Sequence, residues 1–430
     1  MTAAPPSSPG PDARTVLLRF GPMIYGPTAL YSFGQGAVLP LLPILAVHLG
    51  ASLSVAALVP AGIVVGQLCG NIPAGWLVSR VGERTTMIIA AAGSLVACAV
   101  MLFAEFWGLL ALGALLVGLF AAAFALARHT FMTTRVPYSV RSRALAALGG
   151  AFRLGAFTGP FVAAALLGVF HDERAAIWFF AAVLVLVGLL VAFGPDPERT
   201  LIRQESAARE EVVEDTGEAV TGSIPTAERV GVWRTMRRNR EVLSRLGLAA
   251  ASLAAVRAAR PAILPLWGVS LGLDSQTIAL VVGVSGAIDF ALFYVSGQIT
   301  DRFGRLASTL PALGLMGASL LLLSFTHGLE DAALWFGVCA IVLGVGNGLS
   351  SGILLTIGAD IAPEREPAAF LGSWRTITDA GGASTPLLIS GVTALASLSV
   401  ATGIVGAVGL LGALAFLRWV PRYAPGPPRG

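Results

Sequence analysis

Lysine is absent from this sequence of 430 residues, and all 28 of its basic residues are arginines. Charged residues make up only 12% of the chain, against roughly 25% in a soluble domain. Hydrophobic residues reach 56%, so most of the chain must face lipid or other apolar helices. Because the arginines lie beside hydrophobic runs, the net charge of +4 does not indicate nucleic-acid binding.

Cysteine is scarce, and its pattern excludes two kinds of site. Cys69, Cys98 and Cys339 fall inside apolar runs without CxxC spacing, so we expect neither a disulfide framework nor a metal site. The sequence also lacks a G-x-x-x-x-G-K-[ST] motif and any soluble domain that could bind ATP. No H-x-x-x-H or diaspartyl constellation is present, and we expect neither an enzyme nor a cofactor.

One sequence element occurs twice, 222 residues apart. Gly75–Arg84 and Gly297–Arg305 each place arginines and a glycine in a short connection between two apolar runs. Further matches at the same offset are Leu42-Pro43 with Leu264-Pro265, Leu49-Gly50 with Leu271-Gly272, Arg153 with Arg375, and Gly159 with Gly381. The chain is therefore interpreted as a tandem duplication of one membrane unit.

Windows of about 20 apolar residues predict an all-α integral membrane protein with twelve transmembrane helices in two six-helix repeats. The predicted helices lie near 20–49, 54–78, 86–104, 107–130, 144–169, 175–194, 243–270, 276–299, 307–325, 332–358, 368–393 and 398–418. The corresponding parts of the chain are a tail (1–19), two bundles (20–194 and 243–418), a central loop (195–242) and a second tail (419–430).

The arginines orient these helices. If both termini are cytoplasmic, the cytoplasmic segments hold 22 arginines and the opposite side holds one, Arg174. The positive-inside rule then predicts a multi-pass protein of the cell membrane with both termini in the cytoplasm. The central loop ends in a basic cluster, Arg234 to Arg240, and is interpreted as a flexible linker with an anchor at the membrane surface.

Twelve helices in two repeats, with G-x-x-x-D-R-x-G-R between the second and third helix, resemble the major facilitator superfamily. The segment Gly34–Gly50 resembles the first helix of its drug:proton antiporter branches. On the fifth helix, Gly155, Gly159 and Pro160 resemble part of their antiporter motif, although Phe161 to Ala164 stand where that motif continues with a glycine pair. The resemblance implies transport of a small-molecule substrate by alternating access between the two bundles. We expect a monomer that contacts only the lipid bilayer and its substrate.

The duplicated element is predicted to form a cytoplasmic gate. Its glycines let helices approach closely, and Asp301 can lie at the partly positive N-terminal end of a neighbouring helix. In the first copy Ser79 replaces this aspartate, which predicts a weaker lock. The gate residues are Gly75, Arg80, Gly82, Arg84, Gly297, Asp301, Arg302, Gly304 and Arg305.

Charged residues within the predicted helices are functional candidates, because each costs about 2.5–3.5 kcal/mol at bilayer depth. They are Arg128, Arg153, Arg257, Arg260, Arg375, Asp289 and Asp379. The repeat offset places Arg257 against Gln35, Asp289 against Gln67, and Arg375 against Arg153. We therefore expect these side chains to face one central cavity, together with the repeat-related aromatic residues Phe152 and Trp374.

Depth along the helices predicts two ion pairs. Arg153 and Asp289 lie at similar depth on helices that pack against each other in the resembling fold, and Arg375 and Asp379 lie four residues apart on one helix face. Arg257 and Arg260 suit an anionic substrate. In the alternative interpretation, one of them reaches the membrane surface or pairs with Asp289 or Asp379.

The absence of an ATP site leaves an ion or substrate gradient as the energy source. Asp289 and Asp379 are the candidate proton carriers, and the resulting hypothesis is proton-coupled export of small organic molecules or drugs. One alternative is uptake of an organic anion, favoured by the arginines within the helices. A second is a membrane sensor that transports nothing, for which the central loop is the only candidate partner-binding region.

Overall fold

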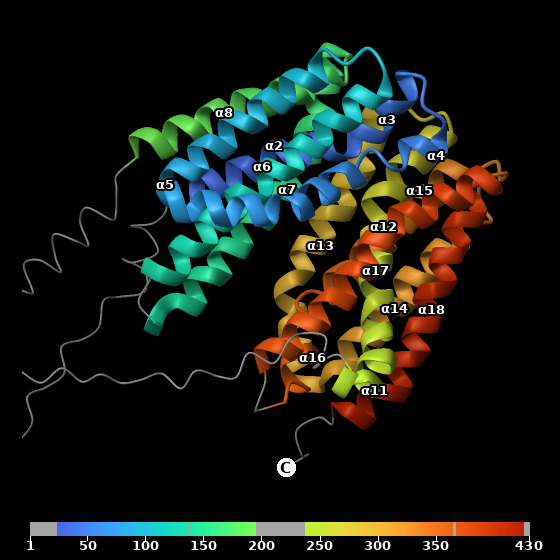
Figure 1. The fold of residues 1–430 in the computed structure, drawn as a ribbon. Helices are drawn as coiled ribbons and strands as arrows, with labels where there is room; N and C mark the ends of the chain where they lie inside the picture. The colour runs from blue at the N-terminus through green and yellow to red at the C-terminus, as the bar shows by residue number, and fades with distance from the viewer. Residues whose placement is uncertain (1–23, 136–137, 195–236, 364–366, 425–430) are drawn as a thin grey trace, which may run out of the picture.

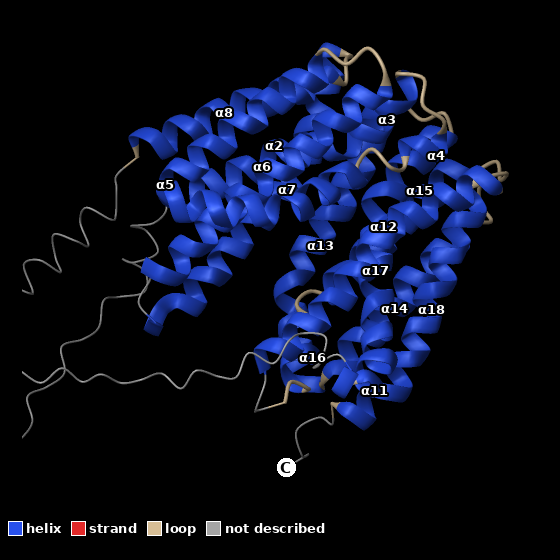
Figure 2. Cartoon of the chain, viewed as in Figure 1, coloured by secondary structure: helices blue, strands red, loops and turns tan. Residues whose placement is uncertain are grey.

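The computed structural model describes residues 24–135, 138–194, 237–363 and 367–424, and every regular element in them is a helix (Figure 2). The predicted tail 1–19, most of the predicted loop 195–242 and the last residues of the tail 419–430 lie outside the described residues.

The first half of the chain contains one broken span and four long helices. Pro40 and Pro43 each lack a backbone donor, and they lie where the first span passes from α-helix through a 3-10 turn to α-helix. The elements are α2 (Gly26–Val38), η2 (Leu39–Leu41), α3 (Leu42–His48), α4 (Leu53–Ala56), α5 (Ala61–Leu102), α6 (Trp107–Arg135), α7 (Tyr138–Phe170) and α8 (Arg174–Phe193).

The second half repeats this order, with an additional break in its fourth span. The elements are α11 (Arg240–Val242), the π-helical turn η3 (Leu243–Gly247), α12 (Leu248–Ser270), α13 (Ser275–Phe303), α14 (Arg305–Leu323), α15 (Ala332–Leu349), α16 (Ile353–Asp360), α17 (Pro367–Leu395) and α18 (Leu398–Tyr423). Asp274 and Ser397 accept backbone hydrogen bonds that cap the starts of α13 and α18.

Ten segments of the described residues are long and apolar enough to cross a membrane. One of them, Leu53–Leu102, has 50 residues and as a straight helix would extend about 75 Å, more than twice the hydrocarbon thickness. Non-helical φ and ψ at Gly82 divide it into two crossings. With this division the described residues make eleven apolar crossings. The 29-residue α17, which is not among those ten segments, lies at the position of the remaining predicted helix.

The duplication is visible in the backbone itself. Gly50 and Gly272, which are related by the repeat offset, have φ of 85° and 71°, and each follows the first span of its half. Gly82 and Gly304, related by the same offset, have φ of 80° and 87° with ψ of 170° and 174°. This part of φ/ψ space is open essentially to glycine alone. The two halves therefore share turn geometry as well as sequence landmarks.

The two bundles meet at one end and diverge at the other (Figure 1). Contacts between the halves join α7 to α13, α4 to α17, and η2 and α3 to α12. We call the end with α3 and α4 the joined end. The other end carries Gly82 and Gly304 at the loops predicted to form the gate, and we call it the gate end.

Candidate functional site: a central cavity between the two halves

A cavity of about 530 Å³ lies between the halves, within the range typical of small-molecule sites. Its lining comes from α2, α5 and α7 on one side and from α12, α13 and α15 on the other. Six of the predicted substrate and proton residues line it: Gln35, Gln67, Phe152, Arg257, Arg260 and Asp289.

The spacing of residues on α12 explains one wall. Arg257, Arg260 and Leu264 recur at intervals of three and four residues, so that they share one helix face, and all three line the cavity. The helix is apolar on its remaining sides, where Leu253, Val256 and Ile263 are buried. The core of the second bundle thus fixes the rotation of α12 and directs both arginines inward.

A continuous chain of hydrogen bonds crosses this polar wall. Arg257 donates from Nε to Oδ1 of Asn347 at 3.1 Å, and Asn347 donates from Nδ2 to Oδ2 of Asp289 at 2.6 Å. Arg260 donates from Nη1 to the same Oδ2 at 3.1 Å and forms an ion pair with it. Three helices are tied together around one carboxylate, of which only Oδ2 is used.

The predicted ion pair between Arg153 and Asp289 is wrong. Asp289 pairs with Arg260, which was one of the alternatives for that arginine. Arg153 instead donates from Nη1 to the Ser351 hydroxyl at 3.1 Å, and its guanidinium lies over the Phe293 ring at 4.2 Å. Similar depth along two helices places side chains at one level but does not fix the direction in which each points.

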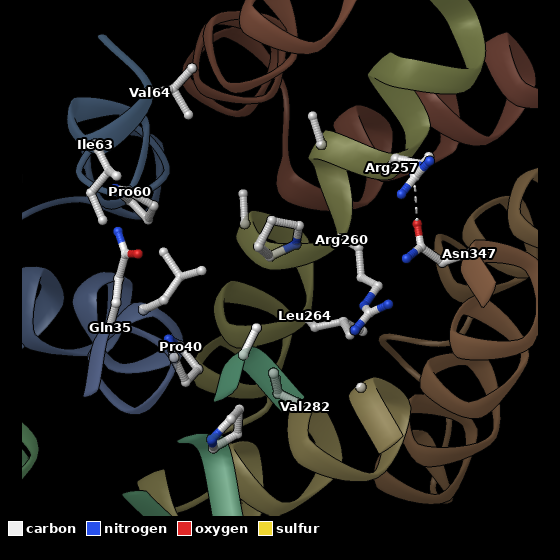
Figure 3. Close-up of a pocket in the computed structure, with 18 of the residues that line it drawn as sticks. Gln35, Pro40, Pro60, Ile63, Val64, Arg257, Arg260, Leu264, Val282 and Asn347 are labelled. Carbon is white, nitrogen blue, oxygen red and sulfur yellow. Dashed lines mark hydrogen bonds between the residues drawn. The ribbon is translucent and has the colours of Figure 1, made fainter. Parts of the chain in front are cut away.

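The opposite wall is largely apolar. Figure 3 shows Gln35, Pro40, Pro60, Ile63 and Val64 on the side of the cavity across from Arg257, Arg260 and Asn347. Gln67 joins Gln35 as an uncharged polar group on this side. The cavity thus has a charged side from the second half and an apolar side with two amides from the first half.

Asn347 is a site residue that sequence reasoning missed. It lines the cavity from α15 and bonds to both Arg257 and Asp289. The repeat offset singled out polar residues whose counterpart 222 positions away is also polar. Asn347 was missed because its counterpart is Ala125. The detectable signal was an amide between two glycines, Gly346 and Gly348, in an otherwise apolar helix.

The break after α15 presents backbone acceptors to side chains of α12 and α13. Gly352 has φ of 77°, and Ser350 and Ser351 separate α15 from α16. Arg257 donates to the Ser350 carbonyl at 3.4 Å, and Ser296 donates to the Leu349 carbonyl at 2.6 Å. The spacing G-x-S-x-G at 348–352 is also found in hydrolases, but here the Ser350 hydroxyl donates to the Asn347 carbonyl within a helix break.

The other predicted cavity residues lie elsewhere. Trp374 is buried, and its indole Nε1 donates to the Leu354 carbonyl at 2.9 Å. Arg375 and Asp379 form the predicted pair at 3.4 Å, but their side chains are 77% and 70% exposed and do not line the cavity. Phe152 is half exposed, lines the cavity and lies under the guanidinium of Arg128.

The gate loops are anchored within their own halves by arginine. Arg84 donates to the carbonyls of Val191, Ala192 and Gly194 at 2.7–2.9 Å, at the end of α8 where free carbonyls and the helix dipole favour a cation. Arg305 holds both oxygens of Asp360 at the end of α16, at 2.6 and 3.1 Å. Each loop is fixed to the last turn of a neighbouring helix.

Of the remaining gate residues, Gly82 and Gly304 are partly buried and the others are exposed at the gate end. Arg80 and Arg302 lie over the rings of Trp76 and Phe303, and Asp301 is exposed. The close helix approach expected at Gly75 and Gly297 is absent, since a Cβ at Gly297 would meet nothing within 4 Å and one at Gly75 only Leu126 at 3.9 Å. The divergence of the bundles at this end accounts for the open space.

The glycines of the fifth-helix motif do make close contacts. A Cβ at Gly155 would lie 2.4 Å from the Ala29 carbonyl oxygen, and one at Gly159 would lie 2.4 Å from backbone of Gly36. At the repeat-related Gly381, a Cβ would lie 2.4 Å from the Ala251 carbonyl oxygen. α7 therefore packs backbone to backbone on α2, as α17 packs on α12, and Pro160 from the same motif lines the cavity.

Glu173 links the halves at the joined end. Its carboxylate accepts a hydrogen bond of 2.7 Å from the Ser275 hydroxyl of the second half and lies 3.5 Å from Nδ1 of His48 of the first. The Glu173 side chain is only 18% exposed, so this polar contact is partly shielded from solvent. These residues connect the first, sixth and eighth crossings.

Comparison with known proteins agrees with the geometry. The Major Facilitator Superfamily pattern matches residues 27–386. A POT family transporter solved with a thioalcohol-conjugated peptide matches with a TM-score of 0.70 and 12% identity, over 93% of this chain and 96% of its own. A D-xylose–proton symporter matches with a TM-score of 0.65 and 15% identity, over 96% of this chain and 99% of its own. At such identities these structures show a shared fold, and no curated protein sequence matches the chain.

Proposed function

Since this chain belongs to the Major Facilitator Superfamily, we propose that it is a proton-coupled secondary transporter of a small organic molecule. Membership in the superfamily makes it a multi-pass membrane transporter and not an enzyme. The proposal of proton coupling rests on the position of Asp289 in the cavity wall, where Arg260 and Asn347 hold it through one oxygen only.

Alternating access assigns a role to each part of the fold. We take 20–194 and 243–418 as the two moving bundles and place the protein in the cell membrane as a monomer with cytoplasmic termini. In that orientation the gate end faces the cytoplasm, and the described conformation is open inward. The polar link of Glu173 to Ser275 and His48 then helps to keep the outer side closed.

Asp289 is suited to carry the coupling proton. It is the only acid that lines the cavity in the part of the chain the structure describes, and its buried Oδ1 has no hydrogen-bond partner there. A proton on Oδ1 would neutralise the carboxyl group and leave Arg260 without its counter-ion. The D-xylose–proton symporter of the same fold supports proton coupling as a proposal for this chain.

Two directions of coupling have support. The resemblance of Gly155, Gly159 and Pro160 on the fifth helix to part of an antiporter motif favours export in exchange for protons, and Pro160 lines the cavity. The second candidate is uptake of an organic anion together with protons, favoured by Arg257 and Arg260 in the cavity wall.

Flux in proteoliposomes tests the proposal. With a panel of organic compounds, a pH gradient should drive wild-type accumulation, and the sign of the gradient that works gives the direction. Asp289→Asn should keep downhill exchange and lose gradient-driven accumulation, because the residue can no longer gain or lose a proton.

Two matched substitutions complete this experiment. Asp331→Asn changes an exposed acid before α15 and should leave gradient-driven accumulation at the wild-type level. Asp379→Asn examines the second predicted proton carrier, which lies outside the cavity lining. Equal loss of exchange and accumulation in Asp289→Asn would refute its coupling role.

A further inference from the structure

The charges around the cavity do not balance. Arg260 is neutralised by Asp289, whereas both hydrogen bonds of Arg257 go to neutral acceptors, the Asn347 amide oxygen and the Ser350 carbonyl. Within the described residues Arg257 has no carboxylate at ion-pair distance, and its Nη2 makes no hydrogen bond. The two lining arginines and one aspartate leave this wall with one net positive charge.

Neighbouring charges increase the imbalance. Among the described residues, Arg153 and Arg260 both repel Arg257, while Asp289 attracts it. A guanidinium in such surroundings presents planar, parallel N–H groups that match a carboxylate or a similar anion. The cavity is therefore electrostatically incomplete without a ligand of negative charge.

We propose that the transported molecule is an organic anion with an apolar body, and that it binds Arg257 together with a proton on Asp289. This inference rests on the proposed function, because it names the substrate class of the same cavity. The anionic group bonds to Nη2 of Arg257 on the charged wall. The body lies against Ile63, Val64 and the prolines of the opposite wall, where Gln35 supplies uncharged hydrogen bonds (Figure 3). Gln67, also in the lining, supplies a second amide.

A cationic ligand fits this cavity poorly. It would meet Arg257 and Arg260 in the lining with Arg153 nearby, and Oδ2 of Asp289 already holds two donors. Only Oδ1 remains as an acceptor on that carboxylate, and the proposed function assigns it to the proton. The chemistry of the wall therefore selects for negative charge.

The same charges set the sign of coupling. The charged groups around Asp289 are Arg257 and Arg260 of α12 and Arg153 of α7, and α15 adds the neutral Asn347. A proton on Asp289 removes the only negative charge that the described residues bring to the lining, and so strengthens attraction for an anion. By linkage, the bound anion favours the proton equally. Co-binding of this kind drives substrate and proton in the same direction, as in uptake by symport.

The test is equilibrium binding to the purified full-length chain, with phenylbutyrate, phenylbutyramide and phenylbutylamine as matched probes. The acid should bind on the order of 10-fold more tightly than the amide, with the amine weakest. Arg257→Gln should abolish the preference for the acid, and Arg257→Lys should keep part of it. Arg418→Gln, an exposed arginine on α18, should keep the full preference.

Charge reversal at Arg257 distinguishes a changed ligand preference from misfolding of the variant. Arg257→Glu should reverse the order, so that the amine binds more tightly than the acid. No preference of the wild type for the acid over the amide, including binding of none of the probes, would overturn the inference. So would a preference that Arg257→Gln leaves unchanged.

The pH dependence of binding tests this inference separately from the proposed function. Wild-type affinity for the acid should rise in acidic buffer, and Asp289→Asn should hold the high affinity at every pH. A phenylpropanesulfonate probe, which stays ionised, excludes titration of the ligand as the cause. If Arg257 governs acid binding but Asp289→Asn still accumulates substrate along a pH gradient, proton coupling at Asp289 fails while the substrate class stands. Weaker anion binding in acidic buffer would overturn the co-binding.

Discussion

Asn347 donates a hydrogen bond of 2.6 Å to Oδ2 of Asp289, the oxygen that also receives Arg260. The amide oxygen of Asn347 meanwhile accepts from Arg257, so that one neutral side chain links the balanced ion pair to the arginine without a counter-ion. The equivalent position in the first half, residue 125, is alanine, so the first half has no counterpart of this amide.

Removing this amide should destabilise the cavity wall. Asn347→Ala deletes one donor to Asp289 and the acceptor of Arg257 Nε, and a partly buried charged group that loses its partner costs about 1–3 kcal/mol. We expect lower thermal stability in detergent. Asn347→Asp keeps an acceptor for Arg257 but cannot donate to ionised Asp289, so its deficit should shrink in acidic buffer. Wild-type stability in both variants would show that the hydrogen-bond chain does not contribute to thermal stability.

Close packing of helices should be sensitive to a single methyl group. Gly159→Ala and Gly381→Ala each place a Cβ about 2.4 Å from the backbone of the facing helix, so the helices must separate, at a cost of roughly 1–3 kcal/mol. Gly149→Ala on α7 and Gly391→Ala on α17 are the controls, because a Cβ there meets nothing within 4 Å. They should be neutral or slightly stabilising. Thermal unfolding of all four variants gives the comparison, and equal effects at packed and open positions would contradict it.

The glycines at the gate loops should tolerate no side chain for a different reason. Gly82 and Gly304 have open space around them, but their backbone lies in a region that other residues avoid at a cost of about 1–3 kcal/mol. Alanine at either position should lower thermal stability by a similar amount. Gly314→Ala, on α14 in open space, should not. A neutral result at both loops would mean that the turn can adopt another conformation.

The contact at the joined end should bias the conformational equilibrium. Ser275→Ala removes the hydrogen bond to Glu173, which joins the two halves, and should populate the outward-open state more often. A cysteine introduced at Gln35 reports this state through faster labelling by a membrane-impermeant reagent from outside. Ser324→Ala is the control, since that hydroxyl bonds only within its own helix. Unchanged labelling in Ser275→Ala would exclude the link as an outer closure.

Much of the fold is local and could therefore be predicted. Apolar runs give the crossings, and glycines at a fixed offset give both the duplication and the turns at Gly50, Gly82, Gly272 and Gly304. The turns follow because only glycine readily adopts the required φ. The order and number of helices needed no knowledge of tertiary contacts.

The rotation of helices about their axes was not predictable in this way. The repeat placed Trp374 beside Phe152 as an equivalent, yet Phe152 lines the cavity and Trp374 is buried. Arg153 likewise has the right depth to meet Asp289 but points to Ser351. The repeat offset predicts how far along its helix a residue lies. Which partner its side chain contacts depends on the rotation of that helix and on the neighbouring helices, which the offset does not give.

The break at Gly352 makes the fourth span of the second bundle differ from that of the first. Its counterpart in the first half, Thr130, lies within the continuous helix α6, whereas the fourth span of the second half is divided between α15 and α16. Arg153 of the first half donates a hydrogen bond to the Ser351 hydroxyl at this break. The first half is broken in its first span and the second half in its fourth, beside the binding cavity. The motion between inward and outward states therefore need not be symmetric even though the architecture nearly is.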